Sequence, residues 1–124
     1  MSRRKKRQRS FGEYYIKQFL EYNNINYMKE KTFSDCLNLK NNKLRFDFYL
    51  VDYNILIEFQ GKHHYMPVNK YNRAKRVYNK TVLHDQIKRQ YCEDNEITLI
   101  EISYLDLGNI FDVLIEELNK ILGE

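Results

Sequence analysis

Asp47, Glu58 and Gln60 have residue types and a spacing that could hold a metal ion. Asp47 lies in one run of strand-forming residues, and the other two lie in the next run, after a short polar turn. If the two runs form a β-hairpin with its turn centred on Asp52 and Tyr53, counting outward pairs Asp47 with Glu58. Side chains alternate along a strand, so Gln60 shares the face of Glu58. The pattern therefore predicts two carboxylates and an amide on one face of a hairpin.

Two carboxylates placed in this way would repel each other. Directly opposed side chains have Cβ atoms about 4.5 to 5.5 Å apart, and like charges there are destabilising by up to about 1 kcal/mol. A divalent cation would relieve the repulsion, and Mg²⁺ favours one or two carboxylates together with waters and phosphate oxygens. Such a metal polarises a phosphate and lowers the pKa of a bound water. The alternative is that the three side chains are simply the solvated face of the hairpin.

Other residues could take part in this chemistry, and each also has a simpler explanation. His64 could accept a proton or orient a water, or it is an exposed histidine of a loop. Asp85 and Lys88 share a face of a predicted helix, where they belong to the site or form an ordinary surface ion pair. Glu13 either completes a metal shell or belongs to a capping box, in which it bonds back to the amide of Ser10.

These residues belong to short motifs that follow one another along the chain. The motifs are Phe46-Asp47-Phe48, Ile57-Glu58-Phe59-Gln60-Gly61, His64-Tyr65, and Asp85-Gln86-Ile87-Lys88 followed by Tyr91. With Glu13 on the first helix, their order and spacing resemble the PD-(D/E)xK, or restriction-endonuclease-like, nucleases. The match is similar to the Vsr-like members and other small phage and bacterial groups, and it spans about residues 10–104.

The resemblance implies a reaction and a set of ligands. Asp47 and Glu58 would hold Mg²⁺, for which Mn²⁺ can substitute, with help from the backbone carbonyl of Phe59. The reaction would be hydrolysis of DNA phosphodiester bonds that leaves a 5′-phosphate.

The chain also departs from the family pattern. Gln60 stands where the family usually has lysine, so the resemblance assigns the activation of water to Lys88 or His64 instead. Phe46 stands before Asp47 in place of proline. Two cysteines cannot reproduce the structural zinc site of the Vsr-like mismatch enzymes, which disfavours that mismatch function.

The elements that must position these residues can be predicted from periodicity and turn signals. Helices are expected over about residues 12–24, 81–95 and 110–122, and strands over about 27–33, 45–51, 55–60 and 97–102. Val82, Ile87 and Tyr91 are candidates for the buried stripe of the second helix, where Tyr91 is either core or site lining. The predicted class is α/β, with a restriction-endonuclease-like core of order αβββαβ, a mixed central sheet flanked by helices, and a C-terminal amphipathic helix.

Length and composition fit one globular domain. The chain has 124 residues, of which 43% are hydrophobic and 31% are charged. We expect a flexible basic arm over residues 1–9 and a single nuclease domain over 10–124. The sequence contains neither an apolar run of membrane-spanning length nor a signal peptide, which predicts a cytoplasmic protein, or a nuclear one in a eukaryotic host. Cys36 and Cys92 are expected to be reduced thiols without a chemical role.

Positive charge is concentrated in two segments, although the net charge is only +4. The expected nucleic-acid contacts are Arg3, Arg4, Lys5, Lys6, Arg7 and Arg9 in the arm, and Lys62, Lys70, Arg73, Lys75, Arg76 and Lys80 in a basic loop that precedes the second helix. Such concentration favours a polyanion, here DNA. The arm could instead be a solubilising tail or a nuclear address. Tyrosines 65, 71 and 78 among the basic residues either stack on bases or cover the core.

The predicted function is a Mg²⁺-dependent endodeoxyribonuclease that nicks DNA, acts as a homing-type nuclease or cuts selected structures. One domain offers one cleavage centre, so cutting both strands requires a homodimer or two successive nicks. One alternative is a catalytically inactive nucleic-acid-binding module of the same fold, for which Gln60 is the main argument. A Holliday-junction resolvase is the more specific nuclease role. A basic regulatory or structural protein with an acidic surface hairpin is the remaining alternative.

Overall fold

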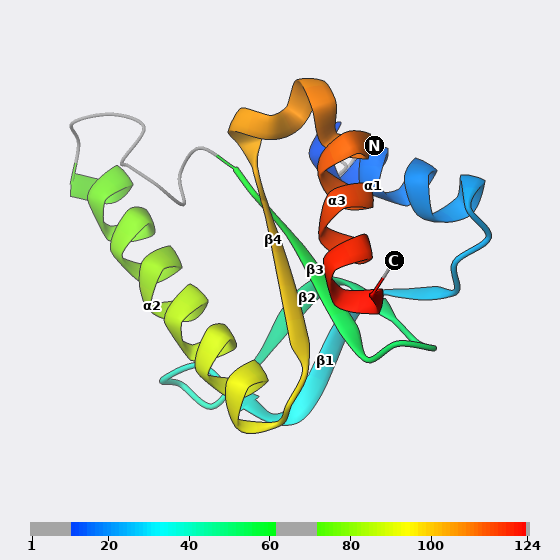
Figure 1. Ribbon diagram of the computed structural model, residues 1–124. Helices are drawn as coiled ribbons and strands as arrows, with labels where there is room; N and C mark the ends of the chain where they lie inside the picture. The colour runs from blue at the N-terminus through cyan, green and yellow to red at the C-terminus, as the bar shows by residue number, and fades with distance from the viewer. Residues whose placement is uncertain (1–10, 62–71, 124) are drawn as a thin grey trace, which may run out of the picture.

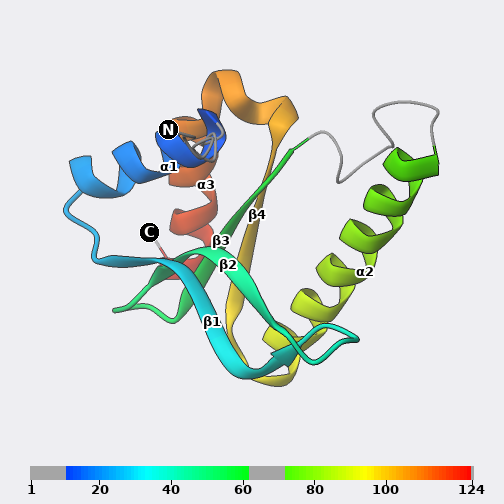
Figure 2. The ribbon, with the colours of Figure 1, turned by 180° about the vertical axis from the view of Figure 1, so that it is seen from behind.

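One four-stranded sheet with helices against both faces forms the described part of the chain, residues 11–61 and 72–123 of a computed structural model (Figures 1 and 2). In chain order the elements are α1 (Phe11–Tyr22), β1 (Tyr27–Leu37), β2 (Lys43–Leu50), β3 (Ile55–Gln60), α2 (Asn72–Asp94), β4 (Thr98–Ser103), the 3₁₀ helix η2 (Tyr104–Asn109) and α3 (Ile110–Leu122). The predicted α/β class and element order are confirmed, with η2 as an addition.

The sheet is mixed, as predicted, and has the order β1-β2-β3-β4. The pairs β1–β2 and β2–β3 are antiparallel, whereas β3–β4 is parallel. A parallel pair requires a crossover connection, and α2 lies in that connection. Figures 1 and 2 show α2 on one side of the sheet and α1 and α3 on the other. No helix in the described ranges is long and apolar enough to cross a membrane.

The core consists of two clusters, one on each face of the sheet. Ile16 and Leu20 of α1 and Leu114 of α3 pack with side chains of the central strands in the first cluster. The second cluster contains Cys36 of β1 and Cys92 of α2, which are free thiols. Burial raises the pKa of both thiols. Burial on both faces of the sheet explains why β3 begins with an unbroken apolar run, whereas β2 has charged residues at its exposed positions.

Helix α2 begins at Asn72, well before the predicted start near residue 81. Arg73, Lys75, Arg76 and Lys80 therefore lie on a helix and not in a loop, which corrects the prediction. The side chains of Lys75, Arg76 and Lys80 are exposed, so this part of the helix shows no apolar periodicity that the sequence could reveal. Lysine and arginine favour helix, and no glycine or proline interrupts the segment.

Other boundaries differ from the predictions by smaller amounts. β1 continues to Leu37, past the predicted end at residue 33, because it still pairs with β2 through Leu37 and Lys43 after a register shift. α1 ends at Tyr22, where the side-chain amide of Asn23 donates to the carbonyl of Phe19. Polar side chains that bond to the backbone in this way compete with continued helix.

Candidate metal and active site

The β2–β3 ladder has the register that the sequence predicts. Phe48 pairs with Ile57 and Leu50 pairs with Ile55, so one further step places Asp47 opposite Glu58. At that step the two side chains join the strands to each other. The amide of Asp47 donates to Oε2 of Glu58 at 2.8 Å, and the amide of Phe59 donates to Oδ2 of Asp47 at 2.8 Å.

The regular alternation of β2 breaks at Asp47. Phe46 and Phe48, two residues apart, belong to different core clusters, although such residues normally share a face. On the neighbouring strand Glu30 has a φ of 54°, a left-handed conformation that is unusual for a side chain of this size. The β1–β2 register places Glu30 opposite Asp47. Asp47 therefore lies at a local irregularity between two faces of the sheet.

Burial sets the electrostatics of the carboxylate pair. Burial, with a further contribution from the charge of Glu58, raises the pKa of Asp47 to about 7. The charge of Glu13 acts in the same direction. Glu58 is 4% exposed, and burial also raises its pKa, against the opposing effect of Lys88. Both groups would gain from a nearby positive charge.

Lys88 of α2 supplies one positive charge to this pair. Its Nζ lies 2.9 Å from Oε1 of Glu58, and it also lies 5.1 Å from the centre of the Phe46 ring. The Lys88 side chain is only 14% exposed. Asp85, one turn earlier on α2, is also buried, and its charge raises the pKa of Glu58. Lys88 therefore belongs to the carboxylate cluster and not to a surface ion pair.

Gln60 faces the same side of the sheet as Glu58, as predicted, and is 4% exposed. Its Nε2 donates to Oε2 of Glu101 at 2.6 Å, and Nε of Arg89 donates to both oxygens of Glu101 at 2.9 and 3.0 Å. Sequence reasoning missed Glu101 and Arg89. One signal was present, because Glu101 stands between Ile100 and Ile102, in the same apolar–Glu–apolar pattern as Glu58.

Glu13 lies in the first turn of α1, close to Asp47. Gly12 permits this approach, because a Cβ at that position would lie 2.3 Å from ring atoms of Phe59. A small pocket of about 130 Å³ lies between α1, β1 and β2, and it is lined by Glu13, Glu30, Arg45, Phe46 and Asp47. The capping alternative for Glu13 stays a prediction, since Ser10 lies outside the described residues, as does His64.

The donor set fits a hard divalent cation that is completed by water and substrate. In the described ranges, no three side chains of His, Cys, Asp or Glu could hold a metal by themselves. Asp47 and Glu58 are nevertheless adjacent, and Mg²⁺ is usually bound by one or two carboxylates plus waters and phosphate oxygens. Burial raises the pKa of both carboxyl groups, and a bound cation would favour their charged forms. The carbonyl of Phe59 stays a predicted ligand.

The structure also places Tyr91, which was expected to be either core or site lining. The Tyr91 hydroxyl donates to Oδ1 of Asp35 at 2.8 Å, and its ring packs against Phe33 in the second core cluster. Tyr91 therefore covers the second core cluster, and its hydroxyl bonds to β1 and not to the carboxylate pair. The arm residues, Lys62 and Lys70, and the tyrosines 65 and 71, lie outside the described residues.

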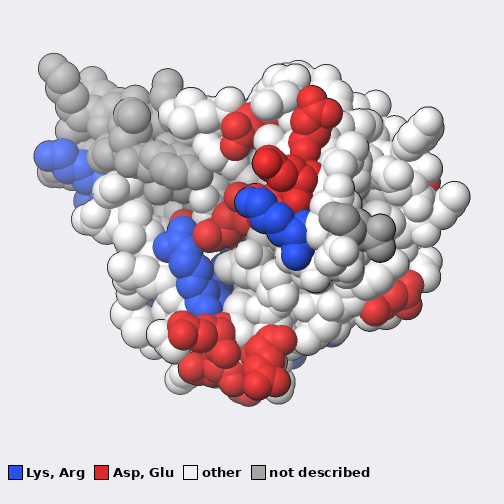
Figure 3. Space-filling view, in the orientation of Figure 1, with Lys and Arg blue, Asp and Glu red and all other residues white. Residues whose placement is uncertain are grey.

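Helix α2 has its charges in the reverse of the order that stabilises a helix. Its first turn contains no acidic residue and its last turn no basic residue. Figure 3 shows basic side chains where α2 begins and acidic side chains where it ends. The positive helix dipole and the basic side chains add together at the N-terminal end. This end of α2 is therefore suited to contact with an anion.

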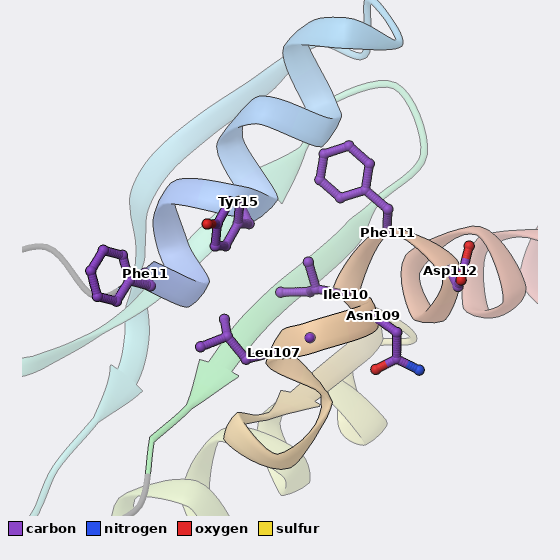
Figure 4. A pocket seen from close by; sticks show the side chains of 8 residues that line it. Phe11, Tyr15, Leu107, Asn109, Ile110, Phe111 and Asp112 are labelled. Atoms are coloured by element: carbon purple, nitrogen blue, oxygen red, sulfur yellow. The ribbon is translucent and has the colours of Figure 1, made fainter.

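A second, larger pocket of about 670 Å³ lies away from the carboxylates, between the start of α1 and the junction of η2 with α3 (Figure 4). Its walls are mainly apolar and include Phe11, Tyr15, Leu107 and Phe111. Among the described residues that line it, Asp112 is the one carboxylate. Because the metal chemistry considered above needs paired carboxylates, the smaller pocket beside Asp47 is the candidate site.

Comparison with known proteins adds little that bears on chemistry. No protein-family model matches the chain, and no solved structure matches it. The chain is similar to "Uncharacterized protein 307L" of Invertebrate iridescent virus 6, with 31% identity over 64 residues. The matched segment is 52% of this chain and 32% of that protein, so the chain spans about a third of its relative's length.

Proposed function

We propose that the protein is a metal-dependent endonuclease that hydrolyses DNA. The observation that carries the proposal is the cluster of a buried Glu58 with a partly buried Asp47 and Lys88, which brings two carboxylates and one ammonium together from β2, β3 and α2. Buried charged groups are costly, and clusters with strongly raised pKa values are enriched at functional sites. The resemblance of the motifs to PD-(D/E)xK nucleases supports the same assignment.

The proposal gives each residue of the cluster a separate role. Asp47 and Glu58 bind Mg²⁺ or Mn²⁺, and the bound metal would polarise the scissile phosphate and lower the pKa of the attacking water. Lys88 holds Glu58 in place through its 2.9 Å ion pair and supplies the positive charge that Gln60 lacks. An ammonium at this place can donate to a phosphate oxygen or orient the water.

The distribution of charge supports DNA as the substrate. Over residues 11–61 and 72–123 there are 16 acidic and 13 basic residues, a balance of −3 that includes the carboxylate cluster. The net charge of +4 therefore comes from the remaining residues, +8 from basic groups and −1 from Glu124. Together with the basic start of α2, these segments provide contacts to phosphates, while the acidic cluster provides the metal site.

Cleavage of supercoiled plasmid tests the proposal. The wild-type protein is expected to convert it to the nicked form in Mg²⁺ or Mn²⁺ and to leave it intact in EDTA. Asp47→Ala and Glu58→Ala should each abolish cutting, whereas Glu116→Ala, which removes an exposed carboxylate on α3, should not. Cutting that survives both site substitutions would exclude this active site.

A second candidate is a nucleic-acid-binding module of the same fold that no longer cuts. The observation in its favour is Gln60, a neutral side chain that cannot act as a general base. The same experiment separates the two functions, because the module would retard DNA in a gel without metal-dependent cleavage. Branched junctions and linear duplexes tested side by side would distinguish a resolvase from a homing-type enzyme or a nickase, and nicked product appearing before linear product would indicate one cleavage centre per particle.

A further inference from the structure

Arg45 lines the same small pocket as Asp47, and most of its side chain is exposed to solvent. We infer that Arg45 binds a phosphate of the DNA backbone at this pocket, next to the metal that Asp47 would hold. The inference rests on the proposed nuclease function, because it names a residue that would bring the substrate to the metal. Arg45 lies outside the two basic segments that the sequence assigns to DNA.

The pocket places Arg45 beside Asp47. Arg45 stands two residues before Asp47 on β2, and it is the one basic residue among the described residues that line the pocket. A phosphate that binds to a metal on Asp47 must approach through the space around that carboxylate. A guanidinium that lines the same space is therefore in a position to meet this phosphate.

The guanidinium of Arg45 has donors available for a phosphate. Its Nη1 lies 3.2 Å from Oε1 of Glu30, and this is its one ion pair within residues 11–61 and 72–123. The side chain of Arg45 is 62% exposed. A guanidinium carries five N–H donors in a planar fork that matches the geometry of a phosphate. The contact with Glu30 thus holds one nitrogen of the group and leaves the others accessible.

The residue that holds Arg45 has an unusual backbone. Glu30 has a φ of 54°, in the left-handed region, at the point of β1 that lies opposite Asp47. Strained residues of this kind cluster at active sites and ligand clamps, where the surrounding structure keeps them in place. An exposed ion pair by itself contributes too little to stability to account for such a backbone. The strain therefore favours a functional position for Arg45.

The charge of the pocket determines when Arg45 can bind a phosphate. When they are ionised, Glu13, Glu30 and Asp47 place three negative charges around the pocket, against the one positive charge of Arg45. This excess repels a phosphate. A divalent cation on Asp47 would cancel the excess and leave Arg45 as a favourable partner. The contribution of Arg45 to DNA affinity should consequently appear only when a divalent cation is present.

Fluorescence anisotropy with a labelled DNA duplex tests the inference in the full-length protein. Binding is measured in Ca²⁺ and in EDTA, on samples whose DNA is shown by gel to be uncut. Arg45→Gln should raise Kd about 10-fold in Ca²⁺, the loss expected for one charged hydrogen-bonded contact, and less than about 2-fold in EDTA. Arg45→Lys keeps the charge but not the fork, so it should recover part of the affinity in Ca²⁺. Because the pair with Glu30 is exposed, both variants should keep the thermal stability of the wild type.

The matched control is Lys43→Gln, which removes the same charge from an exposed residue of β2 that is not among the described lining residues of the pocket. Its Kd should change less than about 2-fold in both conditions. An unchanged Kd of Arg45→Gln in Ca²⁺, equal losses in Ca²⁺ and EDTA, or an equal loss in Lys43→Gln would each overturn the inference.

The same samples separate the inference from the proposed function. A wild-type protein that binds DNA but does not cut it in Mg²⁺ or Mn²⁺ would overturn the proposed cleavage, while the comparison of Arg45→Gln in Ca²⁺ and EDTA would still decide the role of Arg45. A wild-type protein that binds no DNA in either condition would overturn both.

Discussion

A carboxylate that titrates near neutral pH makes folding and metal binding depend on pH at a single residue. Burial and the charge of Glu58 raise the pKa of Asp47 to about 7. The amide of Phe59 compensates only in part, through its bond to Oδ2. The ionised carboxylate of Asp47 therefore destabilises the metal-free fold, and a bound metal ion would remove this destabilisation.

Replacing Asp47 with Asn should change how stability responds to pH. The folded-state pKa of Asp47 lies above its unfolded value, so its contribution to stability is present at low pH and is lost as pH rises through about 7. Asp47→Asn should flatten this decline and be more stable than the wild type at pH 8, by on the order of a few kcal/mol. Urea unfolding without metal at pH 5 and pH 8 measures both curves. A wild-type stability that rises between these pH values, and falls in the variant, would contradict the assigned shift.

Replacing Lys88 with Met should leave Glu58 without its positive partner. Removing one member of a buried ion pair destabilises a protein by about 3 to 5 kcal/mol. We expect a loss of that order at pH 8 and a smaller loss at pH 5, where protonation of Glu58 removes the unpaired charge. Lys120→Met breaks the exposed pair with Glu117 and should cost less than about 1 kcal/mol. Equal losses of stability in the two variants would show that the ion pair of Lys88 is worth no more than an exposed ion pair.

The pairing of Asp47 with Glu58 could be predicted, whereas the contact of Gln60 with Glu101 could not. The first depends on a short turn and on the period of two in a strand, which are local properties. The second depends on the parallel register of β3 and β4, which the packing of α2 sets and the sequence does not display. The contact of Arg89 with Glu101 could not be predicted either, because it also depends on how α2 packs on the sheet.

At the scale of elements, the contact between α1 and β3 positions the site from one side of the sheet. Gly12 lets α1 lie against the Phe59 ring, and the neighbouring residue Glu13 reaches the pocket of Asp47 as a result. The sequence predicted α1 and β3 correctly as elements. Their close approach was not predictable, because a glycine in a helix can equally be a neutral surface residue.

Gly12→Ala should push α1 away from β3. The added methyl would fall within 2.3 Å of ring carbons of Phe59, and overpacking of this kind costs typically about 1 to 3 kcal/mol. Thermal unfolding measures the loss, and Gly108→Ala is the control because it meets no atom within 4 Å. Phe59→Leu should restore part of the stability in the double variant. A Gly12→Ala protein as stable as Gly108→Ala would show that α1 does not depend on this contact.

At the scale of the whole molecule, charge is separated along the chain. Acidic residues outnumber basic ones in the described ranges, while the start of α2 and the remaining segments are basic. The sequence revealed this separation directly, because it depends only on composition. It did not reveal that part of the basic segment is helical, since exposed helix carries no apolar pattern.

Replacing Lys75, Arg76 and Lys80 with Gln should weaken DNA binding without affecting the fold. Each phosphate contact contributes about 0.9 to the slope of log affinity against log salt, so the triple variant should lose up to about 2.7 of slope. Fluorescence anisotropy over a range of salt concentrations measures this loss. A triple variant of the exposed residues Lys40, Lys43 and Lys120 removes the same charge elsewhere and should keep the slope. Equal losses would mean that α2 contributes only net charge.

The backbone hydrogen bonds that the Asp47 and Glu58 carboxylates accept also affect which substitutions the protein could tolerate during evolution. Each carboxylate accepts a backbone amide where the β2–β3 ladder ends, so each holds the sheet together as well as serving the proposed chemistry. A descendant released from selection for cutting would still be selected to fold. It could exchange Asp47 for asparagine, which keeps the bond to the Phe59 amide, far more readily than for alanine. Asparagine at this position in a related sequence would therefore indicate a protein that has lost catalysis and kept the fold.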